Sequence, residues 1–322
     1  MSELRIPENA EIAIAVSGGG DSLALTLLAH EWSKKIIAVT VDHNLREGSA
    51  AEARQVGVWL KKYKIKHKIL TNRKPVPQSG MMDYARKIRY GLMLEYCWKN
   101  KIKYLLTAHN MEDQGETFLM RLERGSGVDG LAAIPAVSET SGVKIIRPLL
   151  DFRREELRKY LKRKKQKWIE DPTNKNTKYK RNRLRKLLEA SGENSGILLN
   201  RLAETAISMR RTKGALETWT GKEIAENFRG NAFLHRHFCQ LPEEIGLRIL
   251  KNILVSLGEK KDAPRFASLM PLYREILAGT LKGRTLAGCK IALKKGKICF
   301  SRESGGGKVS ATPSRRSLLG KV

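Results

Sequence analysis

The sequence predicts an α/β protein, with a doubly wound parallel sheet followed by a smaller C-terminal domain that is helical and then α+β. Two observations support this fold class. Short apolar runs of about five residues alternate with longer stretches of helical periodicity through the first half of the chain. A glycine-rich turn joins the first apolar run to the first helical stretch. Because strands separated by helices imply right-handed crossovers, the strands should be parallel, with ligands outside their carboxyl ends.

The elements of the sheet follow from this alternation. Residues 11–16 (EIAIAV) and 36–41 (IIAVTV) are apolar, β-branched runs typical of buried parallel strands. Further strands are expected at 66–70, 104–107 and 144–147. Helical patterns predict helices at 23–32, 49–63, 81–99, 112–123 and 153–165.

The chain is expected to divide into two domains and a tail. Gly, Asn and Ser gather in residues 191–196, so residues 1–190 should form the first domain and 191–303 the second. In the second domain, 197–216 and 242–257 have helical patterns. Residues 286–300 (LAGCKIALKKGKICF) predict a hairpin that turns at 295–297. The basic, Gly- and Ser-rich residues 304–322 are expected to be disordered.

Charge indicates the class of partner. The chain of 322 residues holds 62 Lys and Arg against 33 Asp and Glu, a formal net charge of +29. Such a surface attracts polyanions and releases their counterions, so nucleic acid is the leading partner, with a basic genome composition as the alternative. Residues 151–190 alone hold 16 Lys or Arg and 6 Asp or Glu. A hydrophobic content of 41% argues against wholesale disorder.

Other classes of protein are disfavoured. No run reaches the roughly 18 apolar residues of a membrane span, and the first residues (MSELRIPEN) do not resemble a signal peptide, so a cytoplasmic location is expected. The cysteines contain no CxxC pair and are too scattered for a disulfide or zinc framework. They are Cys97, Cys239, Cys289 and Cys299.

A phosphate site is predicted in the first turn, where SGGGDS lies between strand and helix. Glycines let backbone amides approach an anion that a helix N-terminus also favours. A Walker A loop and a dinucleotide turn are excluded by spacing, since Leu23 and Ala24 stand where the Walker lysine and hydroxyl would be. An ordinary tight turn is the alternative. The predicted phosphate-binding residues are Ser17, Gly18, Gly19, Gly20, Asp21 and Ser22.

Further segments resemble one family in order and spacing over residues 11–190. They are DHNLREG at 42–48, AHNMEDQGE at 108–116, RGSGVDG at 124–130, RPL at 147–149, WIEDPTN at 168–174 and RNRLR at 181–185. Together with SGGGDS they resemble the tRNA(Ile)-lysidine synthetases of the N-type ATP pyrophosphatase (PP-loop) superfamily, whose fold is adenine nucleotide alpha hydrolase-like. Gly20 departs from the pattern, because related loops often carry a larger residue there.

The resemblance implies a ligase that uses ATP and Mg²⁺. Such an enzyme adenylates the wobble cytidine of the CAU anticodon of tRNA(Ile), and L-lysine then displaces AMP. The codon read changes from AUG to AUA. Asp21 would help to hold Mg²⁺, and residues 191–303 would bind tRNA. Family members form dimers, so a homodimer is possible.

Two acids at the predicted start of the fourth helix are candidate site residues. Asp113 and Glu116 lie three apart and therefore share one face, near the phosphate turn. They could hold Mg²⁺ or receive a lysine ammonium, and the residues alone leave this choice open. Acids that interact with the helix dipole are the alternative. The resemblance adds His109, which could otherwise be an ordinary strand-end histidine.

Arginines complete the predicted site. Arg89 matches the family's site arginine and would offset phosphate charge, whereas solvated surface pairing is the alternative for it and for Arg86. Arginines that alternate among lysines suit a phosphate backbone better than a salt-bridged helix face. These predicted tRNA-binding residues are Arg181, Arg183 and Arg185.

Two other functions stay open. A tRNA thiolase would share the glycine turn, but it normally needs reactive cysteine pairs, which this sequence does not show. The second alternative is a non-catalytic RNA-binding protein that retains the fold of an ATP-binding enzyme. The product formed from tRNA, or its absence, separates them from a ligase.

Overall fold

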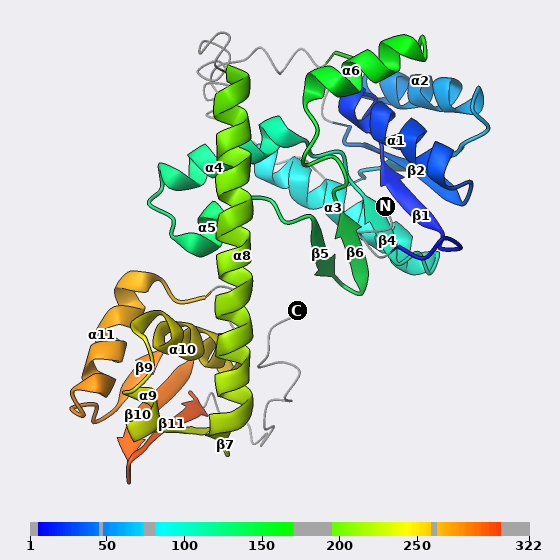
Figure 1. Ribbon diagram of the computed structural model, residues 1–322. Coiled ribbons are helices and arrows are strands. Elements are labelled where there is room, and N and C mark those ends of the chain that lie inside the picture. Colours follow the sequence, from blue (N-terminus) through cyan, green and yellow to red (C-terminus); the bar gives the residue numbers. More distant parts are fainter. Residues whose placement is uncertain (1–5, 45–47, 74–80, 171–194, 259–262, 304–322) are drawn as a thin grey trace. The chain divides into compact units, whose positions relative to one another are not determined.

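The computed structural model describes residues 6–44, 48–73, 81–170, 195–258 and 263–303 (Figure 1). The chain forms two compact units, Met1–Arg210 and Arg211–Val322. The predicted domain boundary at 190/191 lies outside the described residues, as does the predicted disordered tail, 304–322. No helix in the described ranges is long and apolar enough to cross a membrane.

The first unit is built on a six-stranded sheet with the order β3-β2-β1-β4-β6-β5. Five strands are parallel, and only the edge strand β5 is antiparallel to its neighbour β6. The strands are β1 Ile12–Ala15, β2 Ile36–Asp42, β3 Lys66–Thr71, β4 Tyr104–Leu106, β5 Val137–Thr140 and β6 Val143–Ile146. The predicted doubly wound sheet is confirmed.

The helices of the first unit cover both faces of this sheet (Figure 1). Ile12 and Ile14 of β1 share a core with residues of α1, α2 and α6, whereas Ala13 packs with residues of α3 on the other face. A central parallel strand needs apolar residues on both faces, as IAIA provides. The helices are α1 Gly20–Trp32, α2 Ser49–Lys61, α3 Met81–Lys99, α4 Met111–Leu122, α5 Val128–Leu131 and α6 Arg154–Arg163. The long helix α8, Ser195–Asn227, begins in this unit.

The strand order places a switch point between β1 and β4. From β1 the chain adds β2 and β3 on one side, and it then returns to add β4 on the other. The turns that follow β1 and β4 therefore leave the sheet in opposite directions and leave a crevice between them. These turns hold SGGGDS and residues 107–110, which carry predicted site residues.

The second unit holds an antiparallel five-stranded sheet with the order β7-β8-β11-β10-β9. The predicted hairpin is confirmed: β10 pairs with β11, and the turn is Lys295 (φ 47°) and Gly296 (φ 70°). Positive φ at both central residues is typical of a tight hairpin turn. The elements are β7 Phe228–Arg229, β8 Ala232–Leu234, α9 His235–Phe238, α10 Glu243–Gly258, α11 Phe266–Leu277, β9 Arg284–Leu286, β10 Cys289–Lys294 and β11 Lys297–Arg302.

Candidate nucleotide site

The turn after β1 is held by its own serines. The N–H of Ser17 donates to Oγ of Ser22 at 3.2 Å, and the hydroxyl of Ser22 donates to the carbonyl of Gly19 at 2.9 Å. The two hydroxyl oxygens lie 3.3 Å apart. Ser22 is buried. The bracketing serines therefore shape the turn, and Ser17, which is exposed, can reach a ligand.

Gly18 needs to be glycine at this place. Its φ is +87°, a left-handed conformation, and an added Cβ would lie 2.7 Å from Cδ1 of Ile169 and 2.9 Å from Cγ2 of Val56. Its carbonyl accepts a hydrogen bond from the N–H of Ile169 at 2.9 Å. The turn is thus wedged between α2 and the segment that contains Trp168 and Ile169.

Helix α1 begins directly at this turn. Its N-cap, Gly19, offers no side-chain cap to the first N–H groups. Uncapped N–H groups at the start of a helix attract anions. At Gly20 an added Cβ would lie 3.7 Å from Trp168, an ordinary contact, so the backbone there does not require glycine. The turn has the geometry of a phosphate site.

A cluster of charges lies where α1, α4 and α6 begin. Oδ2 of Asp21 accepts a hydrogen bond from Nδ2 of Asn110 at 2.9 Å and from Nε of Arg154 at 3.3 Å. Arg154 also approaches Oδ1 of Asp113, at 3.9 Å. One guanidinium therefore links two of the predicted site carboxylates, which come from opposite sides of the β1/β4 crevice.

Asp113 also caps the N-terminus of α4. Its carboxylate accepts from the N–H of Asn110 at 3.1 Å, while the Asn110 side chain accepts from the N–H of Asp113 at 2.9 Å. This reciprocal capping box fixes the start of α4. Asp113 can therefore interact with the dipole of α4, the alternative that the sequence left open, and also belong to the charge cluster.

Electrostatics favour a charged Arg154. Burial opposes the charge, but the carboxylates of Asp21, Asp113, Glu112 and Glu116 outweigh it, so the pKa of Arg154 is raised. Burial raises the pKa of Asp21; Arg154 lowers it, and the charge of Asp113 raises it. Arg154 therefore favours the ionised form of Asp21.

Glu112 and Glu116 extend the cluster along α4. The carboxylate of Glu112 accepts from the backbone N–H of Arg154 at 3.0 and 3.1 Å, and burial raises its pKa. Glu116 is fully buried, at 0% exposure, and contributes to the raised pKa of Arg154. The face predicted to carry Asp113 and Glu116 thus points toward Arg154.

The two remaining predicted site residues are His109, which follows β4, and Arg89, which lies in α3. Nδ1 of His109 is 3.1 Å from Oγ1 of Thr107. The guanidinium of Arg89 lies 5.9 Å from the ring centre of Tyr90. The pKa of His43, which follows β2, is lowered by burial and by the charge of Arg89. Arg89 therefore projects positive charge toward the carboxyl edge of the sheet.

The described residues can supply only a few ligands to a magnesium ion. No group of three or more metal-ligating side chains occurs among the described residues. Mg²⁺ in nucleotide sites is commonly held by one or two carboxylates together with phosphates and water. Asp21, next to the phosphate turn, fits that donor set.

The structure brings the phosphate turn, Asp21, Asp113 and Glu116 to one edge of the sheet. Arg181, Arg183 and Arg185 lie outside the described residues. Arg154 was not predicted, because it is one of many basic residues in 153–165. The available signal was its place directly after a predicted strand and loop, at the edge where ligands bind.

Comparison with known proteins identifies the class. Residues 2–191 match the family model of the PP-loop domain, which binds ATP. A U34-tRNA thiolase, NcsA from Methanococcus maripaludis, shares the fold, with a TM-score of 0.52 and 20% identity. The match covers 63% of this chain and 74% of that one.

The particular family follows from sequence relatives. The tRNA(Ile)-lysidine synthase of Wolbachia pipientis wMel is 41% identical over 308 residues, covering 92% of this chain and 71% of the relative. That of Bradyrhizobium diazoefficiens is 35% identical, covering 95% of this chain and 91% of the relative. The chain belongs to the tRNA(Ile)-lysidine synthase family of ATP-using ligases, as its motifs predicted.

Proposed function

We propose that this protein ligates L-lysine to carbon 2 of the wobble cytidine in the CAU anticodon of tRNA(Ile), at the expense of ATP. The codon read then changes from AUG to AUA. The observation that carries the proposal is the junction of a glycine phosphate turn with the Asp21, Asp113 and Arg154 cluster at the β1/β4 crevice. Family membership supports the choice of substrates.

The first step requires activation of a poor leaving group. The cytosine carbonyl oxygen attacks the α phosphate of ATP and pyrophosphate leaves. Amides of Gly18, Gly19 and Gly20 would hold the pyrophosphate, with Ser17 and Ser22 beside them. Asp21 would hold Mg²⁺, which would neutralise phosphate charge. Arg89 would offset the charge that develops as the phosphate bond breaks.

In the second step the lysine amine attacks carbon 2 and AMP departs. Asp113 would receive the ammonium, which must lose a proton before it attacks, and the buried Glu116 would add negative charge behind it. His109, between Thr107 and the start of α4, would line the same crevice. The choice between lysine and Mg²⁺ at Asp113 and Glu116 is proposed in favour of lysine, since Asp21 is nearer the phosphate turn.

Asp113→Asn is expected to stop lysine transfer with little loss of ATP binding. Asparagine keeps an oxygen that can accept from the N–H of Asn110, so α4 stays capped, while the negative charge that receives the ammonium is lost. Equilibrium nucleotide binding and labelled lysine transfer measure the two effects. Normal product formation would remove Asp113 from the mechanism.

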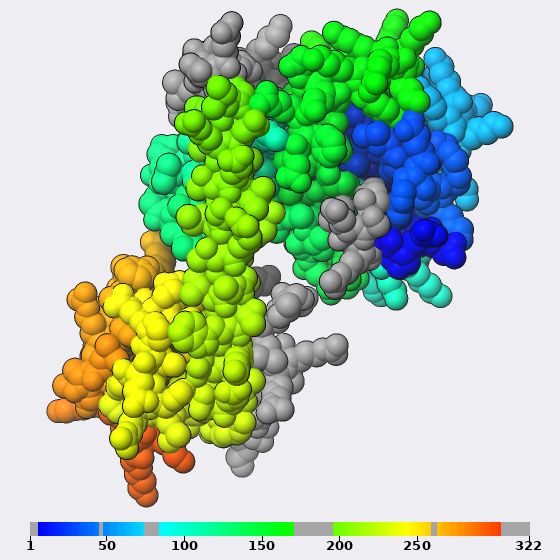
Figure 2. Space-filling model, in the orientation of Figure 1, coloured from blue at the N-terminus to red at the C-terminus, as the bar shows by residue number. Residues whose placement is uncertain are grey.

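Basic side chains would hold the tRNA while the target base leaves its stack, a cost of a few kcal/mol. Exposed basic residues of α6, green in Figure 2, lie on the surface of the first unit. They include Arg158, Lys162 and Arg163. In the sequence, α6 precedes the predicted tRNA-binding arginines, which lie outside the described residues.

Alanine at Arg181, Arg183 and Arg185 together is expected to weaken tRNA binding and to lower its salt dependence. Each lost phosphate contact should reduce the slope of log affinity against log salt by about 0.7–0.9. Filter binding at several salt concentrations measures the slope. An unchanged slope would count against these residues.

Product analysis tests the function directly. The protein, ATP, radiolabelled lysine and a tRNA(Ile) with a CAU anticodon should give labelled tRNA, whereas the same tRNA with a UAU anticodon should not. Absence of label from both would contradict the proposal.

The alternatives are disfavoured by the thiols and by the site. Burial raises the pKa of Cys97 to about 11, and burial also raises the pKa values of Cys239 and Cys289. Reactive cysteines have lowered pKa values, so these thiols do not suit sulfur transfer. A non-catalytic RNA-binding protein would have no use for the charge cluster. A cytoplasmic location and a homodimer stay predictions.

A further inference from the structure

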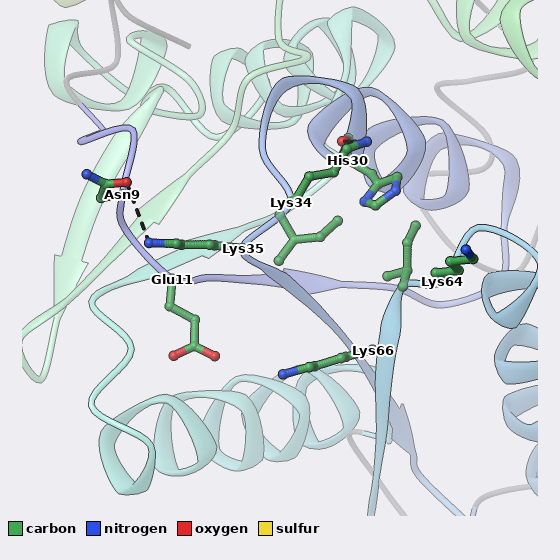
Figure 3. Close-up of a pocket in the computed structure, with 9 residues that line it drawn as sticks. Asn9, Glu11, His30, Lys34, Lys35, Lys64 and Lys66 are labelled. Atoms are coloured by element: carbon green, nitrogen blue, oxygen red, sulfur yellow. Dashed lines mark hydrogen bonds between the residues drawn. The ribbon is translucent and has the colours of Figure 1, made fainter.

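A second concave site lies at the opposite edge of the same sheet, where β1, β2 and β3 begin (Figure 3). We call this cavity of about 450 Å³ the amino-edge pocket. Three segments of chain converge on it: the one before β1, the α1–β2 turn and the α2–β3 turn. The side chains that bear on its chemistry are Glu11, His30, Lys34, Lys35, Lys64 and Lys66.

The pocket has an excess of positive charge. Lys34 donates to the carbonyl of His30 at 2.9 Å, and Lys35 donates to Oδ1 of Asn9 at 3.5 Å, so both contacts are to neutral oxygens. No ion pair joins any of the four lysines to another residue in the described ranges. Glu11 is the one carboxylate in the lining, and its single charge offsets a quarter of the lysine charge.

His30 adds an unsatisfied polar atom. Its Nδ1 is buried and has no hydrogen-bond partner in the described part of the chain. Buried polar atoms in native proteins are usually paired, and the exceptions indicate a bound ion, ligand or water. Burial and the charge of Lys34 lower the pKa of His30, the charge of Glu31 opposes them, and a bound anion would act in the same direction as Glu31.

The arrangement suits a nucleic-acid backbone. Lysine ammoniums are point charges that tolerate varied phosphate geometry, whereas a single enclosed phosphate is more often held by arginine forks or backbone amides. Lys34 and Lys35 lie in the α1–β2 turn, Lys64 lies in the α2–β3 turn and Lys66 begins β3, so lysines from separate segments surround the pocket and can contact successive phosphates. Strand β2 separates this edge from the nucleotide site by roughly 20 Å, a span that an RNA stem covers.

We propose that the amino-edge pocket binds backbone phosphates of an RNA, at a place remote from the reacting base. The identity of that RNA as tRNA(Ile) rests on the proposed function, but the site itself does not. Contacts to phosphate orient the RNA without reading its sequence, so they set the register of the substrate on the first unit.

The double variant Lys64→Gln/Lys66→Gln tests the proposal. The side chains of these lysines make no hydrogen bond to another described residue, and the substitutions leave their backbone hydrogen bonds in place. We expect about tenfold weaker tRNA binding near 0.1 M salt and a salt slope smaller by about 1–2. The rate of lysine transfer at saturating tRNA should not change.

The matched control is Lys61→Gln/Lys62→Gln. These residues are exposed at the end of α2, close in sequence to the pocket, but they do not line it. The control removes the same charge from the same region. Equal losses in both variants, or an unchanged slope in the pocket variant, would overturn the proposal.

Wild-type protein gives a second readout that does not depend on the variants. Bound tRNA should protect Lys64 and Lys66 from an acylating reagent, as measured by mass spectrometry, more than it protects Lys61 and Lys62. Protection by inorganic phosphate but not by tRNA would replace the proposal with a small-anion site. Because binding and protection need no turnover, a failure to form lysidine would overturn the proposed function alone.

Discussion

Gly18→Ala is expected to abolish pyrophosphate release. Alanine at φ +87° costs about 1–2 kcal/mol, and overpacking against Ile169 and Val56 costs about 1–3 kcal/mol more. The turn can relieve this only by moving away from α2 and from Ile169, which displaces the amides proposed to hold pyrophosphate. We expect a rate of pyrophosphate release at least about 10²-fold lower, together with a lower melting temperature.

Alanine variants of two other glycines serve as controls for this result. Gly214→Ala, in α8, meets no atom within 4 Å and should leave stability and rate nearly unchanged. Gly20→Ala makes only an ordinary contact with Trp168, so its loss should be much smaller than that of Gly18→Ala. If the three variants behaved alike, the close packing of Gly18 would not explain its effect.

Arg154→Gln is expected to give the second large loss. The change leaves Asp21, Asp113, Glu112 and Glu116 without the guanidinium that lies among them. Removing one partner of a largely buried ion pair lowers the free energy of unfolding by about 3–5 kcal/mol. Because Asp21 and Asp113 also lose the counter-charge that keeps them in place, we expect lysine transfer near neutral pH to fall by about 10²- to 10³-fold, a loss of about 3–4 kcal/mol in transition-state stabilisation.

The loss should depend on pH in a defined direction. Burial and the charge of Asp113 both raise the pKa of Asp21, and Arg154 opposes them. Without Arg154 the pKa of Asp21 rises further, so the carboxylate becomes protonated at a higher pH. The acid limb of the rate profile should move upward in pH, with part of the activity recovered in alkaline buffer.

Lys159→Ala is the control for charge on the same helix. Lys159 is exposed and forms an ion pair with Glu155 across one helical turn, an interaction of little energetic weight. Its pH profile should match the wild type. A profile of Arg154→Gln that is lowered in parallel at every pH would contradict a role through Asp21.

The sheet could be predicted because its central strands are short, continuous apolar runs. β1 and β2 are buried on both faces, and a buried parallel strand needs few other signals. In contrast, β5 (VSET) was missed, since it is an exposed edge strand that depends on pairing with β6. The same holds for β7 and β8, which are short: β7 depends on pairing with β8, and β8 on pairing with β11.

Helices were predicted where their apolar face is regular. The pattern at 197–216 gave only part of α8, which continues to Asn227 because Ile224 packs into the core of the second unit. Helix α11 was missed. It contains Pro271, which is unfavourable in a helix interior, and its buried residues belong to that same core. In both cases tertiary packing outweighs the local pattern.

The candidate site was predictable in its glycine turn and its acids but not in their counter-ion. Three glycines between strand and helix have a specific physical use, and two acids three apart share a helix face in any sequence. The importance of Arg154 appears only in the folded chain. There the start of α6 lies beside the start of α1, and Arg154 donates a hydrogen bond to Asp21. That proximity is a property of the fold.

An oxygen label tests the central claim, that ATP activates the carbonyl oxygen of the wobble cytidine. A tRNA(Ile) with ¹⁸O at that oxygen would be incubated with the protein, ATP and lysine, and the AMP released would be analysed by mass spectrometry. We expect the ¹⁸O in the phosphate of AMP, with one AMP for each lysidine formed. Lysine transfer that yields unlabelled AMP, or ADP in its place, would contradict the account.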